Sequence, residues 1–205
     1  MTMKTLFLQP PSFDGFDGGA GSRYQAKREI KSFWFPTWLA QPAALLPDST
    51  LIDAPPAKLT MADVLPHATT HQLLIIHTST PSFANDVKVA EEFKKLNPAM
   101  MVGFIGAKVA VQPVESLERA PVLDFVCGNE FDFTIKEIAE GKPLPEVLGI
   151  WWRNGNGEIV KNDDRPLLMD MDELPFVVDV YKKHLRMEDY FICLLYTSPS
   201  PRDRT

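Results

Sequence analysis

The sequence has little cysteine, and its few potential metal ligands are scattered. Only Cys127 and Cys193 occur among the 205 residues. A disulfide framework needs several cysteines, and a zinc-cysteine site needs cysteines at short spacings; two cysteines in unrelated settings support neither. The four histidines also show no spacing with cysteines or acidic residues that resembles a metal site. These absences support neither a disulfide scaffold nor a metal-cysteine cluster.

The chain also lacks an excess of positive charge and any long apolar run. Lys and Arg number 21 against 27 Asp and Glu, for a net charge of −6. Nucleic acid is therefore not an expected partner, because binding it needs a basic stripe that neutralises phosphates. The longest apolar stretches, such as residues 72–76, are far shorter than the ~20 residues of a membrane helix, and the N-terminus has no signal-peptide pattern. We expect a cytoplasmic protein with no membrane span.

Familiar catalytic motifs are missing as well. The sequence contains neither a GxSxG nucleophile elbow nor a Walker loop. No other constellation of nucleophile, base and acid stands out. Read from its residues alone, the chain is a ligand-binding α/β domain.

What is present is an alternation of short apolar segments and helical patterns. Strands are predicted at residues 4–8, 49–53, 73–77, 100–105 and 123–126, and helices at 36–46, 60–67, 82–96, 113–119 and 131–140. Parallel neighbouring strands need crossovers of about a dozen residues. The alternation therefore predicts a doubly wound, Rossmann-like, mainly parallel five-stranded sheet with helices on both faces. A small hairpin is predicted around NGNG, between residues 149–153 and 158–161, and residues 170–181 suggest an extended linker.

Polar and small residues follow several of the predicted strands. Ligands of such sheets bind at the carboxyl ends of the strands, near the point where the strand order reverses. Ser79 or Thr80 could bond a polar ligand group there, or could simply cap the next helix. Gly106 could admit a flat ligand, although a tight turn explains it equally well. For Glu130 and Asp132, near a helix start, we favour a structural role in contact with the helix dipole.

A resemblance to a known family rests on an ordered set of segments. They are LFLQPPS, LIDAPPA, IIHTSTPSF, GFIGAKVAVQPVESL, DFVCGNEFDFTIKEIAEG, GIWWRNGNGEIVKNDDRP and DMDELPF. Together they resemble the N-terminal half of cobalamin-binding radical SAM enzymes and cover the chain through about residue 191. Residues 15–43, GFDGGAGSRYQAKREIKSFWFPTWLAQPA, resemble the hopanoid-biosynthesis-associated members, which are linked to the polyol side chain or cyclitol ether headgroup of bacterial hopanoids.

The resemblance implies that cobalamin is held over the strand ends. A following radical SAM domain would supply a 4Fe-4S cluster and S-adenosylmethionine. Carried over by position, the ring-facing residues are Gln9, Pro10, Ser79, Thr80, Gly106, Ala107, Asn129 and Glu130. The chain departs from the family in three places: DxHxxG is absent after the first strand, GAKVAV stands for the usual GGxHxT, and Gly128 stands for the usual arginine. The first loop therefore offers no histidine as a lower axial ligand.

The resemblance also predicts how the chain is organised. We expect a cobalamin-binding-like Rossmann domain at residues 1–145, a hairpin and linker toward the radical SAM domain at 146–191, and a non-native tail at 192–205. The tail, ICLLYTSPSPRDRT from residue 192, resembles translated adapter sequence. Cys193 alone cannot hold an iron-sulfur cluster, so this polypeptide by itself is expected to be inactive.

The alternative is a non-enzymatic α/β binding domain or receiver-like domain that binds no corrin. A receiver needs acidic residues after its first strand and a lysine after its last. Asp14 and Asp17 lie in the first loop, but no lysine closely follows Val126. The missing lysine weakens this alternative.

The linker pattern and the unusual tail generate a prediction about the gene. Genomic sequence should continue the reading frame past residue 191 and encode a CxxxCxxC motif within a few tens of residues, since three thiolates are needed to hold the cluster. Long-read sequencing of the locus would test this. A stop codon at the same place in several independent reads would rule it out.

Overall fold

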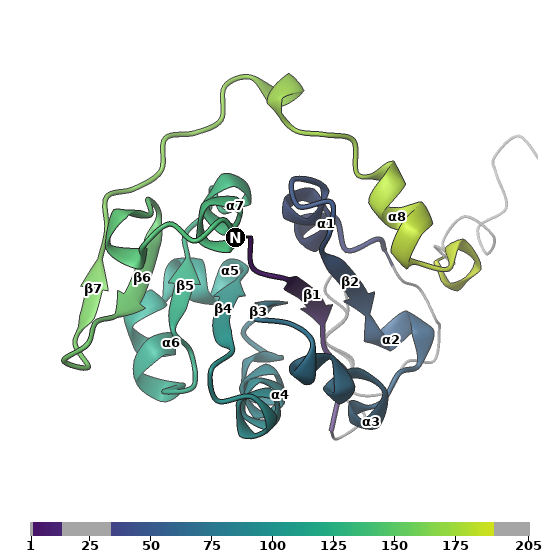
Figure 1. The fold of residues 1–205 in the computed structure, drawn as a ribbon, viewed down its shortest axis with the longest axis horizontal. Coiled ribbons are helices and arrows are strands. Elements are labelled where there is room, and N and C mark those ends of the chain that lie inside the picture. Colours follow the sequence, from purple (N-terminus) through teal and green to yellow (C-terminus); the bar gives the residue numbers. More distant parts are fainter. Residues whose placement is uncertain (1, 14–33, 191–205) are drawn as a thin grey trace, which may run out of the picture.

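The protein, described here by a computed structural model over residues 2–13 and 34–190, contains a single seven-stranded sheet within those ranges (Figure 1). The strand order is β2-β1-β3-β4-β5-β6-β7. The five predicted strands are confirmed and pair in parallel: β1 (Thr5–Gln9), β2 (Thr50–Asp53), β3 (Leu73–His77), β4 (Met101–Ile105) and β5 (Phe125–Cys127).

The predicted hairpin forms the other two strands, β6 (Ile150–Arg153) and β7 (Ile159–Lys161). We expected it to follow the sheet as a separate element, and the count of five strands was therefore wrong. Instead β6 pairs antiparallel with β5 and extends the sheet, and β7 then pairs with β6. The turn sequence favours a hairpin locally, but the choice of β5 as its neighbour is a long-range contact that no local pattern encodes.

Helices cover both faces of the sheet, as the doubly wound prediction requires. Two hydrophobic clusters lie on opposite sides of the strands. One cluster packs against α1 (Thr37–Ala44), α7 (Asp132–Ala139) and α8 (Val178–His184), and the other against α2 (Ala54–Ala57), α3 (Met61–Val64), α4 (Phe83–Leu96), α5 (Ala107–Val111) and α6 (Pro113–Arg119). Of the helices described, none combines the length and the apolar character needed to cross a membrane.

Strands buried on both faces explain why the sequence shows unbroken apolar runs rather than alternation. Leu74 and Ile76 of β3 contribute to the cluster on the α4 side, while Leu73 and Ile75 contribute to the cluster on the α1 side. All four side chains are fully buried. The sheet is thus the middle of three layers, and its strand ends are what remain accessible for binding.

Local signals set several helix boundaries. Thr60 forms the predicted capping box, in which its backbone N–H donates to the Asp63 carboxylate at 2.7 Å. Gly141, with φ of +91°, follows the end of α7 as predicted. The helices α2 and α5 were not predicted, because α2 contains two consecutive prolines and each helix has only four or five residues.

The predicted extended linker is partly helical. We define residues 166–177 as the strap, which runs from beyond β7 past α7 and α1 to α8 (Figure 1). It contains a short 3-10 helix, Met171–Glu173, and α8 begins directly after it. The sequence does not predict α8, because the valines at 177, 178 and 180 are β-branched and disfavour helices. Tertiary packing overrides this preference.

Aromatic side chains hold the segment after the strap against the domain. The ring of Phe35 stacks on Tyr181 and on Tyr190, with centroid distances of 4.6 and 4.4 Å. The hydroxyl groups of Tyr181 and Thr37 lie 2.9 Å apart, and the Tyr190 hydroxyl donates to the Asp53 carboxylate at 2.8 Å. Residues 178–190 therefore pack on α1 and β2 rather than extending away.

Gly103 in the middle of β4 makes room for the ring of Phe125 on β5. A Cβ placed on Gly103 would lie 2.1 Å from Phe125 Cζ. We expect Gly103→Ala to lower the free energy of unfolding by about 1–3 kcal/mol, because the closely packed core must shift. Gly155→Ala is the control, since nothing lies within 4 Å of its added Cβ. Urea denaturation followed by tryptophan fluorescence would measure both, and equal stability of the two variants would contradict the packing argument.

Candidate functional site

The topology marks the carboxyl ends of the parallel strands as the side of the sheet on which such folds bind ligands. From β1 the chain moves outward to β2 and then returns to β3 on the other side of β1. The helices that come after β1 and after β3 in the chain, α1 and α4, therefore pack on opposite faces of the sheet. This divergence is the switch point at which open α/β sheets bind ligands. We call the ends of β1 to β5 on this side the carboxyl edge.

Two of the predicted ligand residues, Gln9 and Pro10, are buried at the end of β1. The chain beyond them is tied to α4 by Asn85. Its side-chain amide donates to the Pro11 carbonyl at 3.0 Å and accepts from the Phe13 backbone N–H at 3.0 Å. Residues 14–33, which include most of the glycine-rich loop, lie outside the described part of the chain.

His77 ends β3 and faces the α1 layer. Its ring packs on Trp38 with a centroid distance of 4.7 Å. Burial lowers the pKa of His77 to about 3, so the imidazole is neutral at physiological pH. Its Nε2 points toward Gly106, since a Cβ on that glycine would lie 3.0 Å from it.

Thr78 points to the opposite face, into a buried polar contact that the sequence did not reveal. Its hydroxyl donates to the Asp86 carboxylate of α4 at 2.7 Å. Both residues are essentially inaccessible to solvent. Burial raises the pKa of Asp86 to about 7, although hydrogen bonds from Thr78, Ser82 and Asn85 oppose the rise. A carboxyl group that titrates near neutral pH therefore lies directly beneath the carboxyl edge.

The two hydroxyl residues predicted after β3 have different surroundings. Ser79 is part of a turn: its backbone N–H donates to the Ser82 hydroxyl at 3.0 Å, and the two hydroxyls are 2.9 Å apart. Its carbonyl also accepts the backbone N–H groups of Ser82 and Phe83 at the start of α4. Thr80 is exposed. Ser79 thus shapes the helix start, while the Thr80 side chain is accessible to a ligand.

Gly106 joins β4 to α5 where two strand ends meet closely. Its φ is +113°, and an added Cβ would lie 2.3 Å from the Thr78 carbonyl oxygen. This contact within the protein accounts for the glycine without a ligand. The next residue, Ala107, is exposed. Lys108 turns inward, where it donates to Gln112 at 2.5 Å and pairs with Glu115 at 3.2 Å.

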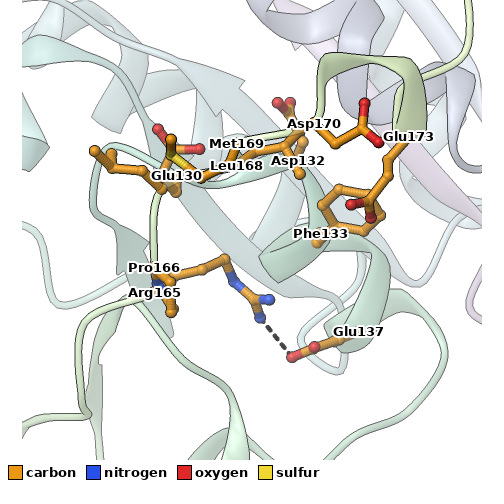
Figure 2. A pocket seen from close by; sticks show the side chains of 11 residues that line it. Glu130, Asp132, Phe133, Glu137, Arg165, Pro166, Leu168, Met169, Asp170 and Glu173 are labelled. Carbon is orange, nitrogen blue, oxygen red and sulfur yellow. Dashed lines mark hydrogen bonds and ion pairs between the residues drawn. The ribbon is translucent and has the colours of Figure 1, made fainter.

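Beyond β5, Asn129 is exposed and Glu130 is half-buried. Glu130 lines a cavity of about 490 Å³ beside α7, between this helix and the strap (Figure 2). Across the cavity Arg165 pairs with Glu137 at 2.6 Å, and Arg165 also donates to the Thr134 hydroxyl at 2.7 Å.

Asp132 lines the same cavity and is the first residue of α7, as a favourable contact with the helix dipole requires. Burial and the neighbouring Glu130 raise the pKa of Asp132 to about 6. Among residues 2–13 and 34–190, no three His, Cys, Asp or Glu side chains are grouped as a metal site.

The edge therefore brings together only some of the eight predicted residues. Thr80, Ala107 and Asn129 are exposed and follow the neighbouring strands β3, β4 and β5. Gln9 and Pro10 lie within the protein, and Ser79 and Gly106 have structural roles. Asn85 and Asp86 were missed, because nothing in the sequence shows that polar residues in the first turn of a helix face the core.

The strand order leaves the receiver-like alternative open. The order 2-1-3-4-5 also occurs in flavodoxin and receiver domains. Asp14 and Asp17, the acidic residues of that alternative, lie outside the described residues. After β5 the chain continues with Gly128 and Asn129, where a receiver would need a lysine. The side chains at the carboxyl edge, rather than the topology, must therefore distinguish the two interpretations.

Comparisons with known proteins show where this fold occurs. No family model matches the chain. The uncharacterized methyltransferase PH0819 of Pyrococcus horikoshii is 25% identical over 182 residues, which cover 84% of this chain and 37% of that protein.

Two solved structures share the fold. They are the cobalamin-dependent S-adenosylmethionine radical enzyme OxsB with aqua-cobalamin and S-adenosylmethionine bound, and the same enzyme in its apo form. Each has a TM-score of 0.62, at 13% and 14% identity over 80% and 85% of this chain. The chain spans 23% and 24% of the length of the OxsB chains and little more than a third of the methyltransferase. The fold is thus one found within a cobalamin-dependent radical enzyme.

The buried Asp86 predicts an unusual dependence of stability on pH. The pKa of Asp86 is about 7 in the folded protein and about 3.9 in the unfolded chain. At pH values between these two, Asp86 is protonated to a greater extent in the folded protein than in the unfolded chain. Its contribution to the free energy of unfolding therefore falls as pH rises from 4 to 7. Asp86→Asn removes this titration, and we expect its stability relative to wild type to rise over that range by up to about 4 kcal/mol.

The measurement is urea denaturation of both proteins at pH 4.5, 6 and 8. Asp48→Asn, at an exposed carboxyl, is the control and should show no comparable trend. A stability difference between Asp86→Asn and wild type that stays constant with pH would show that Asp86 is charged throughout.

Proposed function

We propose that this chain is the cobalamin-binding domain of a radical SAM enzyme, with the corrin ring lying over the carboxyl edge. The observation that carries the proposal is the row of exposed residues Thr80, Ala107 and Asn129 at neighbouring strand ends, within a fold shared with OxsB. We propose the same division of the chain as the sequence predicts: a cobalamin domain at residues 1–145, a connecting region at 146–191 and a non-native tail at 192–205.

The residues of this row fit a broad, flat ligand with amide groups at its rim. Parallel strands are about 4.8 Å apart, so the row from β3 to β5 extends about 10 Å, comparable to the width of a tetrapyrrole-like ring. None of the three side chains is charged, and the nearby Lys108 is engaged by Gln112 and Glu115. Thr80 and Asn129 can bond the amide groups around a corrin.

We also propose that cobalamin binds here without a protein histidine beneath the cobalt. Residues 10–23 contain no histidine. His77 is the nearest candidate, but its ring packs on Trp38 and its Nε2 points toward Gly106. When bound, cobalamin would supply a cobalt centre that can carry an alkyl group. The residues of this chain would position and shield that centre.

The finer parts of the proposal concern the parent enzyme. We propose that a radical SAM domain of the same parent chain, with its 4Fe-4S cluster and S-adenosylmethionine, covers the strap. Met169 and Phe176 of the strap are 89% and 90% exposed, which suits a surface that another domain buries. The resemblance of residues 15–43 supports action on hopanoids, at the bacteriohopanepolyol side chain or its cyclitol ether.

A titration of the 205-residue chain with aquacobalamin tests the central claim. We expect an absorbance change that saturates at one equivalent. Ala107→Trp should weaken binding at least tenfold, because a large side chain would occupy the position of the ring. Ala99→Trp is the matched control: Ala99 is also exposed but precedes β4, at the opposite edge of the sheet.

Electron paramagnetic resonance of the cob(II)alamin complex tests the coordination. We expect no nitrogen superhyperfine splitting that depends on His77. Splitting that vanishes in His77→Ala would show a protein histidine ligand.

In the titration, equal binding by Ala107→Trp and Ala99→Trp would place the ligand elsewhere.

A further inference from the structure

Two consecutive residues in the first turn of α4 contact the strand ends on both sides of the switch point. Asn85 bonds the segment after β1, and Asp86 bonds Thr78 at the end of β3. The two strands are neighbours in the sheet, and the helices α1 and α4 that come after them pack on opposite faces. One turn of α4 therefore contacts the ends of both strands.

The contact made by Asn85 is specific in its orientation. The side-chain NH₂ group donates to the Pro11 carbonyl and the side-chain oxygen accepts from the Phe13 N–H, each at 3.0 Å. Rotating the amide by 180° would set donor against donor and acceptor against acceptor, so only one orientation works. Asn85 thus pairs with residues 11–13 as a neighbouring peptide group would.

The segment after β1 begins with two buried prolines. Pro10 and Pro11 lack backbone N–H groups and cannot donate to the sheet or to a helix. After these prolines, the backbone N–H of Phe13 donates to a side chain of α4. Asn85, 72 residues further along the chain, binds both this donor and the Pro11 carbonyl.

Asn85 itself stands on a rigid support. Asp86 is 1% exposed and is fixed by the Thr78 hydroxyl, while the Asp86 backbone N–H donates to the Ser82 carbonyl at 2.9 Å. The Asn85 amide also lies 3.4 Å from the Asp86 carboxylate. A side chain anchored in this way can set the position of a loop.

We infer that Asn85 is a positioning residue, which holds residues 11–13 against α4 and thereby fixes the β1 side of the carboxyl edge before a ligand arrives. Its role toward a ligand rests on the proposed function; its role toward the segment does not. A ligand that binds to an already ordered loop loses less conformational entropy on binding. Loss of the two Asn85 hydrogen bonds should therefore weaken ligand binding without removing any ligand contact.

The test compares two leucine variants of α4 asparagines. Asn85→Leu removes both bonds to the segment at similar volume. Asn97→Leu is the matched control, because Asn97 also donates to backbone carbonyls, those of Ala68 at 2.9 Å and His71 at 3.3 Å, but at the other end of α4. Asn85→Asp is a second variant that keeps an acceptor for Phe13 and loses the donor to Pro11.

The readouts are hydrogen exchange of the Phe13 amide by nuclear magnetic resonance and affinity for aquacobalamin, both on the 205-residue chain. In Asn85→Leu we expect exchange at Phe13 to be about tenfold faster and affinity to fall about tenfold. Asn97→Leu should match wild type in both, and Asn85→Asp should lie between them.

Unchanged exchange at Phe13 in Asn85→Leu would overturn the inference. Faster exchange with unchanged affinity would overturn the role toward the ligand. If wild type fails to bind aquacobalamin, the proposed function fails instead, and exchange at Phe13 alone decides whether Asn85 positions the segment.

Discussion

Parallel pairing of β1, β3 and β4 is the constraint on which the rest of the structure depends. It requires each strand to be followed by a crossover, and it brings the carboxyl ends of all five parallel strands to one edge of the sheet. Helices on both faces leave that edge as the accessible part of the sheet. The reversal of strand order at β1 then places α1 and α4 on opposite faces, which makes this the switch point of the sheet.

Internal bonding uses most of the polar groups near the carboxyl edge. Thr78 binds Asp86, Ser79 binds Ser82, and Lys108 is held by Gln112 and Glu115. What remains exposed, at Thr80, Ala107 and Asn129, is small or neutral. Such a surface suits recognition by shape and by amide hydrogen bonds rather than by charge, which agrees with the absence of a basic stripe in the sequence.

Much of the fold is predictable because its signals are local. The parallel strands are continuous apolar runs, and Thr60 with Asp63 announces a helix start. The pairing of β6 with β5 and the helical state of α8 depend on distant residues, and so local patterns miss them. Asn85 and Asp86 were missed for the same reason, since their contacts are also with distant residues. The sequence predicts that both lie in a helix, but only the packing shows that they face residues 11–13 and Thr78.

The two outer strands have a consequence for how the domain can associate. The β7 edge has only three residues, and α8 contacts the other outer strand, β2, whose Asp53 accepts the hydroxyl of Tyr190. Short or covered edge strands pair poorly with a strand of another chain. Extension of the sheet into fibrous aggregates is therefore disfavoured on both sides. A partner that docks beside these two strands of the described domain would therefore contact side chains and would not add a strand to the sheet.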